Sequence, residues 1–365
     1  MRILMVLGRA TGGIGVHVDS LTTELRARGH TVDLLTDALT AATFSWDDAH
    51  LHWPHGRDPR RLVAARRATR ALAHGADVVH AHGHQAGAWA AAAGASPLVV
   101  SLHNAILPGT FPRPVATGLQ RFVARRADLV TGASSDLVAE ARRHGARWTE
   151  LAEVPSPRVP ALLRTPLRAV AERRLASAAF VASLERPGLD PALPLVLAVA
   201  RVAPQKRIDV LLEVARRLRG EATVVLVGSA DADLLGRIMA QDTAGDLIHL
   251  GPRPDLDELY ATASVLVLTS TWEARALVVQ EAMAAGLPVV ATDTGGIPDL
   301  VRTGEEVVGE LVPVGDAAAT VAAIRRVLRD PARAEYLSSR GREIAGSWAD
   351  LAATAVVWEN WYRRL

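Results

Sequence analysis

Cysteine is absent from this chain of 365 residues, and lysine is nearly absent. The lack of cysteine excludes disulfide bonds, thiolate catalysis and cysteine-ligated metals, and it is compatible with a reducing compartment. Of the 41 basic side chains, 40 are arginine, and Lys206 is the one exception. Since arginine is used everywhere else, this position indicates a need for a compact, flexible ammonium group, with a capping or surface lysine as the alternative.

Strong net charge and long hydrophobic runs are also missing. The formal net charge is +2 and the basic residues are dispersed, which argues little for nucleic-acid binding. The uncharged run 85–102 is broken by Gly94 and Pro97, so it predicts a short helix and a buried strand rather than a membrane span. The segment Arg2–Leu7 is short and leads into a glycine loop, unlike a secretory signal. We therefore expect a cytoplasmic protein, in solution or at the inner face of the membrane.

Strand and helix patterns alternate through the chain and predict an α/β protein with parallel sheets and helices on both faces. The length suggests two domains. We expect Rossmann-like domains over 1–175 and 190–346, a linker within Arg164–Leu193, and a tryptophan-rich final helix over 347–365. The expected strands lie near Ile3, Val32, Val78, Leu98, Val130 and Leu151 in the first half, and near Leu195, Val225, Ile248, Val265, Val289 and Val308 in the second.

Two glutamates in the second half indicate a ligand site. Glu273 follows an expected buried strand, and Glu281 lies about two helical turns further on. Open α/β sheets bind ligands at the carboxyl ends of their strands, so these carboxylates can reach two separate hydroxyl groups of one extended ligand. The expected elements here are a strand at Ser264–Thr269, a helix at Leu277–Ala285, a strand at Leu287–Thr292 and a turn at Thr294–Pro298 that opens another helix.

Glycines and basic residues at the same sheet edge indicate a phosphate site. Gly295 and Gly296 place backbone N–H groups at a helix start, which suits a phosphate. Arg201 and Lys206 follow a strand and precede a helix, so both cations can converge on one anionic group. The carboxylates can bind hydroxyl groups, and the neighbouring amides and cations can bind a phosphate. Together these residues indicate a pocket for a nucleotide sugar.

An ordered series of such residues runs through both halves of the chain. The second half contains Arg201, Lys206, Gly228, Gly251, Glu273, Glu281 and the pair Gly295–Gly296. The first half contains Gly8 after the first strand, Gly12–Gly15, Glu24–His30, Asp77–His82 and Ser101–His103. This series resembles the family 4 glycosyltransferases, which are retaining nucleotide-sugar enzymes of the GT-B fold. The resemblance implies two Rossmann-like domains facing each other across a cleft, with the acceptor on the first, the donor on the second, and the final helix crossing back onto the first.

The resemblance also implies roles for single residues. Glu281 binds the ribose hydroxyls, Glu273 faces the donor sugar, and the Gly12–Gly13 loop closes on the phosphates. His103 matches the family histidine near the reacting sugar, where it hydrogen-bonds the donor or helps the acceptor lose its proton. Its position alone favours a core histidine at a strand end. The catalytic candidates are His103, Glu273, Arg201 and Lys206, and the further donor-binding candidates are Gly228, Arg253, Arg275, Ala276, Leu277, Gly295 and Gly296.

Two segments depart from the family pattern. The family usually has Gly-Phe-Gly after the first glutamate, whereas this chain has Ala274-Arg275-Ala276, which restricts the backbone and adds a charge near the donor sugar or its acceptor. The family's Pro-Asn-Gly-Val-Asp is replaced by the segment Pro155–Val159. These changes leave the nucleotide-diphosphate site intact and the identity of the sugar open.

Two groups of residues have spacings that resemble those of metal-binding motifs. His80, His82 and His84 alternate at a strand end, so their side chains can share one face as metal ligands or as hydrogen-bonding groups toward the acceptor. No thiol accompanies them and the nearest acid lies at the opposite end of the strand, which favours hydrogen bonding. Asp231 and Asp233 form an Asp-x-Asp pattern, but they fall at a helix start where capping is favoured.

The arginine-rich segment at residues 57–70 has two interpretations, and one of them is contact with a membrane surface. An arginine-rich helix on the outside of the first domain can rest on anionic lipid and meet a lipid-linked acceptor. The alternative, which we favour, is the solvated outer face of a helix whose Leu62, Ala65 and Leu72 pack inward. The arginines of this Arg57–Arg70 segment are Arg57, Arg60, Arg61, Arg66, Arg67 and Arg70.

The chemistry of the bond predicts the reaction. Splitting a sugar from a nucleoside diphosphate leaves negative charge on the phosphate, which Arg201 and Lys206 can neutralise. We expect a retaining, hexosyl-type glycosyltransferase that uses a UDP- or GDP-linked sugar and needs neither cofactor nor metal. The acceptor is expected to be a hydroxyl of a sugar, a lipid-linked molecule or a small molecule. The alternatives are a GT-B nucleotide-sugar epimerase and a nucleotide-sugar binding protein without turnover.

Overall fold

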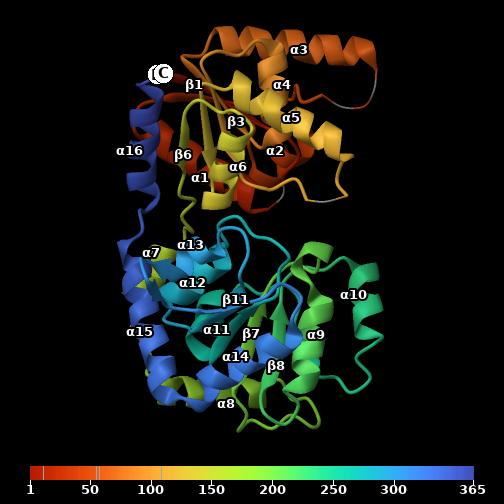
Figure 1. Ribbon diagram of the computed structural model, residues 1–365, viewed down its shortest axis with the longest axis vertical. Coiled ribbons are helices and arrows are strands. Elements are labelled where there is room, and N and C mark those ends of the chain that lie inside the picture. The colour runs from red at the N-terminus through yellow and green to blue at the C-terminus, as the bar shows by residue number, and fades with distance from the viewer. Residues whose placement is uncertain (11, 55, 57, 108) are drawn as a thin grey trace. The chain divides into compact units, whose positions relative to one another are not determined.

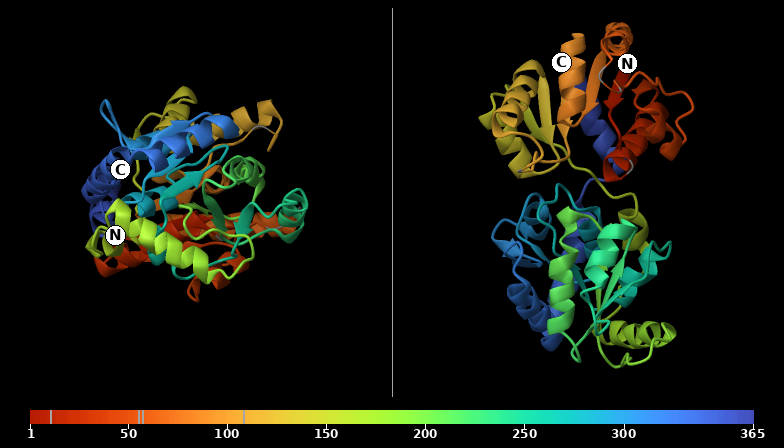
Figure 2. Two further views of the ribbon diagram at one scale, coloured as in Figure 1. Left: turned by 90° about the horizontal axis from the view of Figure 1, so that it is seen from below. Right: turned by 90° about the vertical axis from the view of Figure 1, so that its right-hand side faces the viewer.

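The computed structural model describes residues 1–10, 12–54, 56, 58–107 and 109–365. The chain divides into two compact units (Figure 1). The first unit comprises Met1–Pro157 together with Ala349–Leu365, and the second comprises Arg158–Trp348. Each unit is a parallel sheet between layers of helices (Figure 2).

The first unit contains a six-stranded sheet in the order β2-β1-β3-β4-β5-β6, with every pair parallel. Its strands β3, β4 and β5 are buried along their whole length, as is typical of a parallel sheet with helices on both faces. The strands are β1 (Arg2–Leu7), β2 (Thr31–Leu35), β3 (Val78–His82), β4 (Leu98–Leu102), β5 (Leu129–Gly132) and β6 (Thr149–Leu151). The helices are α1 (Gly13–Ala27), α2 (Ala38–Phe44), α3 (Pro59–His74), α4 (His84–Ala93), α5 (Arg113–Arg126), α6 (Ser135–Arg143) and α16 (Leu351–Tyr362).

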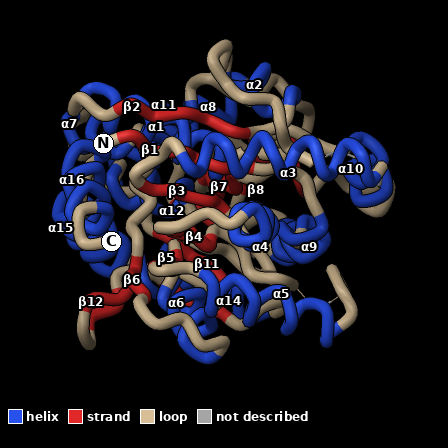
Figure 3. The backbone as a smooth tube through the Cα atoms, turned by 90° about the horizontal axis from the view of Figure 1, so that it is seen from above, coloured by secondary structure: helices blue, strands red, loops and turns tan. Residues whose placement is uncertain are grey.

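The second unit repeats this plan with the strand order β14-β11-β10-β7-β8-β9, again all parallel. The strands, drawn red in Figure 3, are β7 (Leu195–Val199), β8 (Thr223–Val227), β9 (Leu247–His249), β10 (Val265–Leu268), β11 (Val289–Thr292), β14 (Glu310–Val312) and the antiparallel pair β12 (Arg302–Thr303) and β13 (Glu306–Val307). The helices are α7 (Val159–Arg164), α8 (Val170–Ser183), α9 (Ile208–Arg217), α10 (Ala232–Met239), α11 (Leu256–Thr262), α12 (Leu277–Ala284), α13 (Ile297–Val301), α14 (Ala317–Arg329) and α15 (Pro331–Ser347), with a 3₁₀ turn η1 at Pro204–Lys206.

The segment expected to be a linker is largely helical. Val159 and Leu162 of α7 and Val181 of α8 are buried in the core of the second unit. The buried Arg173 of α8 donates to the carbonyl oxygens of Tyr260 and Ala263. The division between the units therefore falls at 157–158, upstream of the expected 164–193, because apolar residues in α7 and α8 give these helices a face to bury.

The final helix is shorter than expected. α15 ends at Ser347, and α16 begins only at Leu351, where the Asp350 side chain accepts a hydrogen bond from the Ala353 N–H at 2.8 Å. A capping residue at this position explains why the chain does not continue as one helix from 347. Trp348 accordingly belongs to the second unit rather than to the last helix.

α16 packs within the first unit although it is the last element of the chain. Trp358 and Tyr362 are buried in the same core as residues of β1, β3 and β4. Glu359 accepts hydrogen bonds from Arg28 Nε at 2.6 Å and pairs with His30 Nε2 at 2.8 Å. The Arg28 guanidinium is the main reason why the pKa of Glu359 is lowered to about 2. Apolar burial and a charged contact thus fix this helix to the first sheet.

The helices are too short or too polar to cross a membrane in the described part of the chain. The run 85–102 forms the helix α4 and the buried strand β4, as its breaks at Gly94 and Pro97 predict.

Candidate active site

Lys206 lies in the short turn η1 between β7 and α9, beside the loop that follows β10. Its Nζ contacts Glu273 Oε1 at 2.5 Å, and both side chains are largely buried. The sequence analysis places the lysine and the glutamate at the same edge of the sheet, and the structure brings them into direct contact. An ammonium and a carboxylate held this closely form an ion pair that is partly shielded from water.

Backbone contacts hold the two loops together. The Thr269 hydroxyl donates to the Lys206 carbonyl at 2.9 Å, and the Thr271 N–H donates to the Gln205 carbonyl at 2.8 Å. The Gln205 side chain donates in return to the Trp272 carbonyl at 2.5 Å. Three hydrogen bonds therefore position the lysine beside the glutamate independently of their own charges. Such support is what a preorganised site requires.

Arg201 lies two residues beyond β7 at the same edge of the sheet. Its side chain is exposed, and among the described residues we find no hydrogen bond or ion pair to its guanidinium. Gly228, which follows β8, allows the two strand ends to approach: a Cβ there would lie 2.1 Å from the Ala200 carbonyl oxygen, and its φ is +146°. This explains why glycine occupies that position.

The glycine pair is packed against the Glu273 loop. A Cβ on Gly295 would lie 1.9 Å from the Glu273 carbonyl oxygen, and φ of Gly295 is +56°, so only glycine fits without movement. The Gly296 N–H donates to that same carbonyl at 2.9 Å. The expectation of amides directed at a phosphate therefore needs correction for Gly296, whose N–H is already used to hold the loop.

Glu281 lies in α12 and is buried, with 6% of its surface exposed. The Tyr260 hydroxyl of α11 donates to Glu281 Oε2 at 2.8 Å. Burial, followed by the charge of Glu281, raises the pKa of Tyr260 well above its ordinary value, so this tyrosine remains a donor. Sequence reasoning missed Tyr260, because a tyrosine 21 positions away in another helix gives no signal of its partner.

The other donor-side candidates are less closely grouped. Arg253 pairs with Asp255 two residues later, at 2.6 Å. The buried Arg275 places its guanidinium 5.8 Å from the centre of the Trp348 ring, a cation–π distance. Ala276 is the N-cap residue of α12 and Leu277 is its first residue.

In the first unit, His103 follows β4 and His82 ends β3. His82 Nδ1 and His103 Nε2 are 3.0 Å apart, and the ring of His17 from α1 lies 5.4 Å from that of His103, centre to centre. All three rings are buried. Burial lowers the pKa of His103 to about 3 and that of His17 to about 4, and it lowers the pKa of His82 well below its ordinary value. The three rings are therefore neutral at physiological pH.

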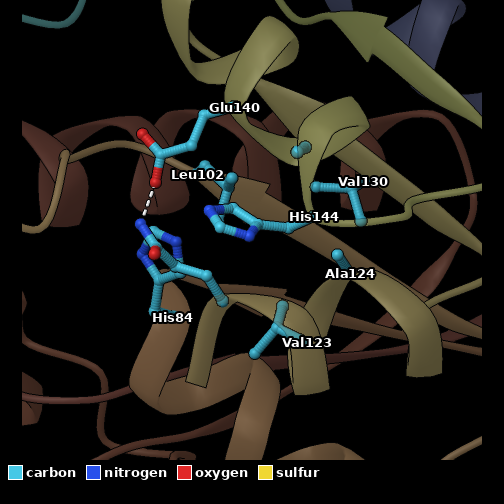
Figure 4. Close-up of a pocket in the computed structure, with 9 residues that line it drawn as sticks. His84, Leu102, Val123, Ala124, Val130, Glu140 and His144 are labelled. Carbon is cyan, nitrogen blue, oxygen red and sulfur yellow. Dashed lines mark hydrogen bonds between the residues drawn. The ribbon is translucent and has the colours of Figure 1, made fainter. Parts of the chain in front are cut away.

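His80, His82 and His84 do not form one group, contrary to the expectation from their alternation. His80 is fully buried, and its two ring nitrogens contact Tyr362 Oη at 2.7 Å and Ser101 Oγ at 2.6 Å. His84 begins α4 and lines a small cavity (Figure 4), together with Gln120, Glu140 and His144. The strand ends before residue 84, so the period-two pattern does not extend to it. His80 thus contacts α16 and lies with its ring centre 4.1 Å from that of His82, whereas His84 lies apart from this pair on α4, and the acceptor-side role of the three histidines stays a prediction.

The remaining predicted residues lie on helices. Gly12 caps the start of α1 and Gly13 is its first residue; Thr11 is outside the described residues. The Asp231 side chain accepts from the Leu234 N–H at 2.9 Å, which confirms capping of α10. In the Arg57–Arg70 segment, Arg57 lies outside the described residues, while the other five arginines are exposed on α3 and the predicted inward residues are half-buried.

His17 was missed by the sequence analysis. It lies one turn into the helix that follows the first strand, a position that faces the carboxyl ends of the neighbouring strands. That spacing is the signal that would have placed it beside His82 and His103.

Comparisons with known proteins agree with both halves of the fold. Residues 12–157 match the sequence profile of a glycosyl transferase 4-like domain, and residues 183–344 match that of the glycosyl transferases group 1. A D-inositol 3-phosphate glycosyltransferase of Xylanimonas cellulosilytica is 30% identical over 94% of this chain and 90% of that protein. One from Streptomyces bingchenggensis is 32% identical over 79% of this chain and 68% of that protein.

Among solved structures, the Anabaena protein Alr3699/HepE in complex with UDP-glucose is similar to this chain with a TM-score of 0.81. The alignment covers 100% of this chain and 100% of that chain. At 21% identity this likeness establishes the fold and not the ligand. The fold is that of the GT-B enzymes, and the two profiles follow one another along the chain in the order of its two units. Since relatives at 30% identity or more span most of both chains, the resemblance seen in the sequence is confirmed, and the chain belongs to the family 4 glycosyltransferases.

Proposed function

We propose that this glycosyltransferase moves a sugar from a nucleoside-diphosphate sugar to an acceptor hydroxyl with retention of anomeric configuration. One observation carries the proposal: Lys206 is fixed beside Glu273 at the strand ends where Arg201 projects an exposed guanidinium. A diphosphate bound at this edge would meet two cations of different shape, one compact and one planar. The glutamate beside the lysine can then contact hydroxyl groups of the donor sugar.

The cations act on the leaving group. As the bond between the anomeric carbon and the phosphate oxygen breaks, its electron pair stays on the phosphate, and Lys206 and Arg201 stabilise that charge. The acceptor oxygen bonds to the anomeric carbon on the face that the phosphate leaves, and the acceptor proton passes to the phosphate. The charge of Lys206 is balanced by Glu273, and this ion pair holds the ammonium in place.

Buried residues orient the rest of the donor. Glu281 accepts from Tyr260, which leaves its carboxylate fixed for the ribose hydroxyls that the family resemblance assigns to it. His103 is neutral, so we assign it a hydrogen bond to the reacting sugar or the acceptor rather than the role of a proton-donating acid. The donors to be tested include UDP-glucose, with which the Anabaena protein of the same fold was solved.

The test of this proposal is transfer with a defined stereochemical outcome. We expect purified protein to consume one member of a panel of UDP- and GDP-sugars and to form a glycoside with the anomeric configuration of that donor. The acceptor panel includes D-inositol 3-phosphate, which the names of two relatives contain. Proton NMR of the new linkage measures the configuration. An inverted product overturns retention, and conversion of the nucleotide sugar without an acceptor would indicate an epimerase.

Chelation is expected to leave transfer intact, because two side-chain cations can perform the charge neutralisation that a metal provides elsewhere. The measurement compares initial rates before and after dialysis against EDTA, with and without added manganese. Complete loss of turnover with recovery on manganese would contradict this expectation. It would indicate Asp231 and Asp233 as candidate metal ligands.

A further inference from the structure

The buried His17 and His82 of the first unit, which lie beside the buried His103, contain ring nitrogens without hydrogen-bond partners. Within the part of the chain that is described, this holds for both ring nitrogens of His17 and for Nε2 of His82. The exposed fractions are 4% for His17, 3% for His82 and 6% for His103. Buried polar atoms in proteins are nearly always paired, and an unpaired one points to a water or an ion at that place. The proposed reaction gives His17 no role.

The geometry of these rings suits one ion. One nitrogen of each of the three histidines lies within 4.8 Å of one nitrogen of each of the others. His82 Nδ1 and His103 Nε2 are already 3.0 Å apart. Nitrogens that each lie about 2.0–2.1 Å from a zinc ion are roughly 3.3 Å from one another in tetrahedral geometry. A small rotation of His17 toward the other two rings would therefore complete three ligand positions.

The donor set selects the kind of metal. It offers three imidazoles, whose neutral form is the form that binds metals, and neither a carboxylate nor a thiolate belongs to the group. Imidazole favours zinc, copper and nickel, whereas magnesium, calcium and manganese favour oxygen ligands. Two of the rings project from the ends of neighbouring parallel strands, β3 and β4, and the third from α1, so rigid elements hold all three.

We propose that His17, His82 and His103 form a binding site for Zn²⁺, and that occupancy of this site inhibits glycosyl transfer. The binding stands on the geometry of the first unit alone. The inhibition rests on the proposed function, because it requires that His103 serve the reacting sugar. A zinc-bound imidazole nitrogen can no longer accept a hydrogen bond, so the ion would remove the coordinating nitrogen of His103 from that role and leave only the other ring N–H as a donor.

Metal binding is tested on the full-length, metal-free protein. Zn²⁺ is titrated in competition with a chromophoric chelator, and Co²⁺ serves as a spectroscopic probe of coordination number. We expect about one equivalent of either metal to bind, with the intense visible absorption of four-coordinate cobalt. His17→Phe should abolish this absorption, and His52→Phe, which removes an exposed histidine, should preserve it. No cobalt spectrum in the wild type, or an unchanged spectrum in His17→Phe, would overturn the site.

The folding of His17→Phe is checked by circular dichroism and thermal unfolding without metal. Since the His17 nitrogens have no partners among the described residues, we expect its melting temperature to match or exceed that of the wild type. If it unfolds, His82→Asn is compared in its place under the same conditions. A rise in the wild-type melting temperature with Zn²⁺, absent from the variant, provides a second readout of binding.

The inhibition is measured separately. Zn²⁺ should lower the transfer rate of the wild type over the concentration range in which it binds, and EDTA should restore the rate. Saturating zinc with unchanged transfer would overturn the inhibitory role while the binding site stands. If no donor on the panel is consumed, the proposed function fails, and the cobalt spectrum still decides whether the histidine site exists.

Discussion

Replacing Lys206 with alanine is expected to lower kcat/KM for transfer by about 10²- to 10³-fold, the usual effect of removing one preorganised group that stabilises developing charge. The backbone of the lysine turn is held by hydrogen bonds from Thr269 and Thr271, and by one from the Gln205 side chain to the Trp272 carbonyl, so the ammonium is positioned before it meets the diphosphate. Arg201→Ala should lower kcat/KM in the same direction, because this guanidinium is exposed and available to the diphosphate. Steady-state kinetics with the preferred donor provide the measurement.

Matched variants separate charge from shape and from folding. Arg207→Ala removes a neighbouring guanidinium that is committed to Asp209 at 2.8 Å, and we expect it to change kcat/KM by less than about threefold. Lys206→Arg keeps the charge but not the compact shape, and should recover only part of the activity. Because Lys206→Ala leaves Glu273 without its cation, thermal unfolding is measured beside each rate. Near-normal turnover in both Lys206→Ala and Arg201→Ala would refute the assignment of these cations.

Acid is expected to destabilise the first unit strongly below pH 6.5. Burial lowers the pKa of His17 and His84 to about 4 and that of His103 to about 3, and it also lowers the pKa of His80 and His82. A histidine that stays neutral in the folded chain binds a proton only after unfolding, so the unfolded state gains protons as the pH falls below 6.5. Each such histidine costs up to about 1.4 kcal/mol of unfolding free energy per pH unit until the folded pKa is reached.

Urea unfolding of metal-free protein at pH 7, 6 and 5 measures this slope. His17→Phe should reduce the dependence of unfolding free energy on pH by the contribution of one buried histidine. His52→Phe changes an exposed position and should leave this dependence unchanged. Two carboxylates of the first unit act differently in this window. The pKa of Glu359 is lowered to about 2, so its contribution is present above about pH 4.5 and is lost only below that value. Burial raises the pKa of Glu140, so this carboxyl favours the folded state as the pH falls and opposes the effect of the histidines. A flat stability between pH 7 and 5 would mean that the histidines are protonated in the folded state.

The sequence predicted the elements around the site because their signals are local. The strand before Glu273, the helix that contains Glu281 and the turn at Gly295 and Gly296 all appear at the predicted positions within one or two residues. The apolar runs of β7, β8 and β10 have the length and composition of buried parallel strands. Strand ends then bring the functional side chains to one edge, as parallel topology requires.

Contacts between distant segments could not be predicted in the same way. Tyr260 and Glu281 meet because two helices pack, and nothing in either local pattern specifies that contact. The Gly296 N–H resembles a phosphate ligand in sequence, yet it pairs with the Glu273 carbonyl once the loops fold. The alternation of His80, His82 and His84 suggested a common face, but the strand ends at residue 82 and the last histidine begins a helix. Such outcomes depend on tertiary packing rather than on spacing.

The place of α16 in the first unit has a consequence for how the protein is made. Trp358 and Tyr362 belong to the core of a sheet whose strands lie more than 200 residues earlier in the chain. A ribosome releases residues in order, so the whole of the second unit emerges before this helix does. The nascent first sheet must therefore keep the apolar surface beneath α16 uncovered until the second unit has been synthesised, and during that interval this surface is exposed to aggregation and to chaperones.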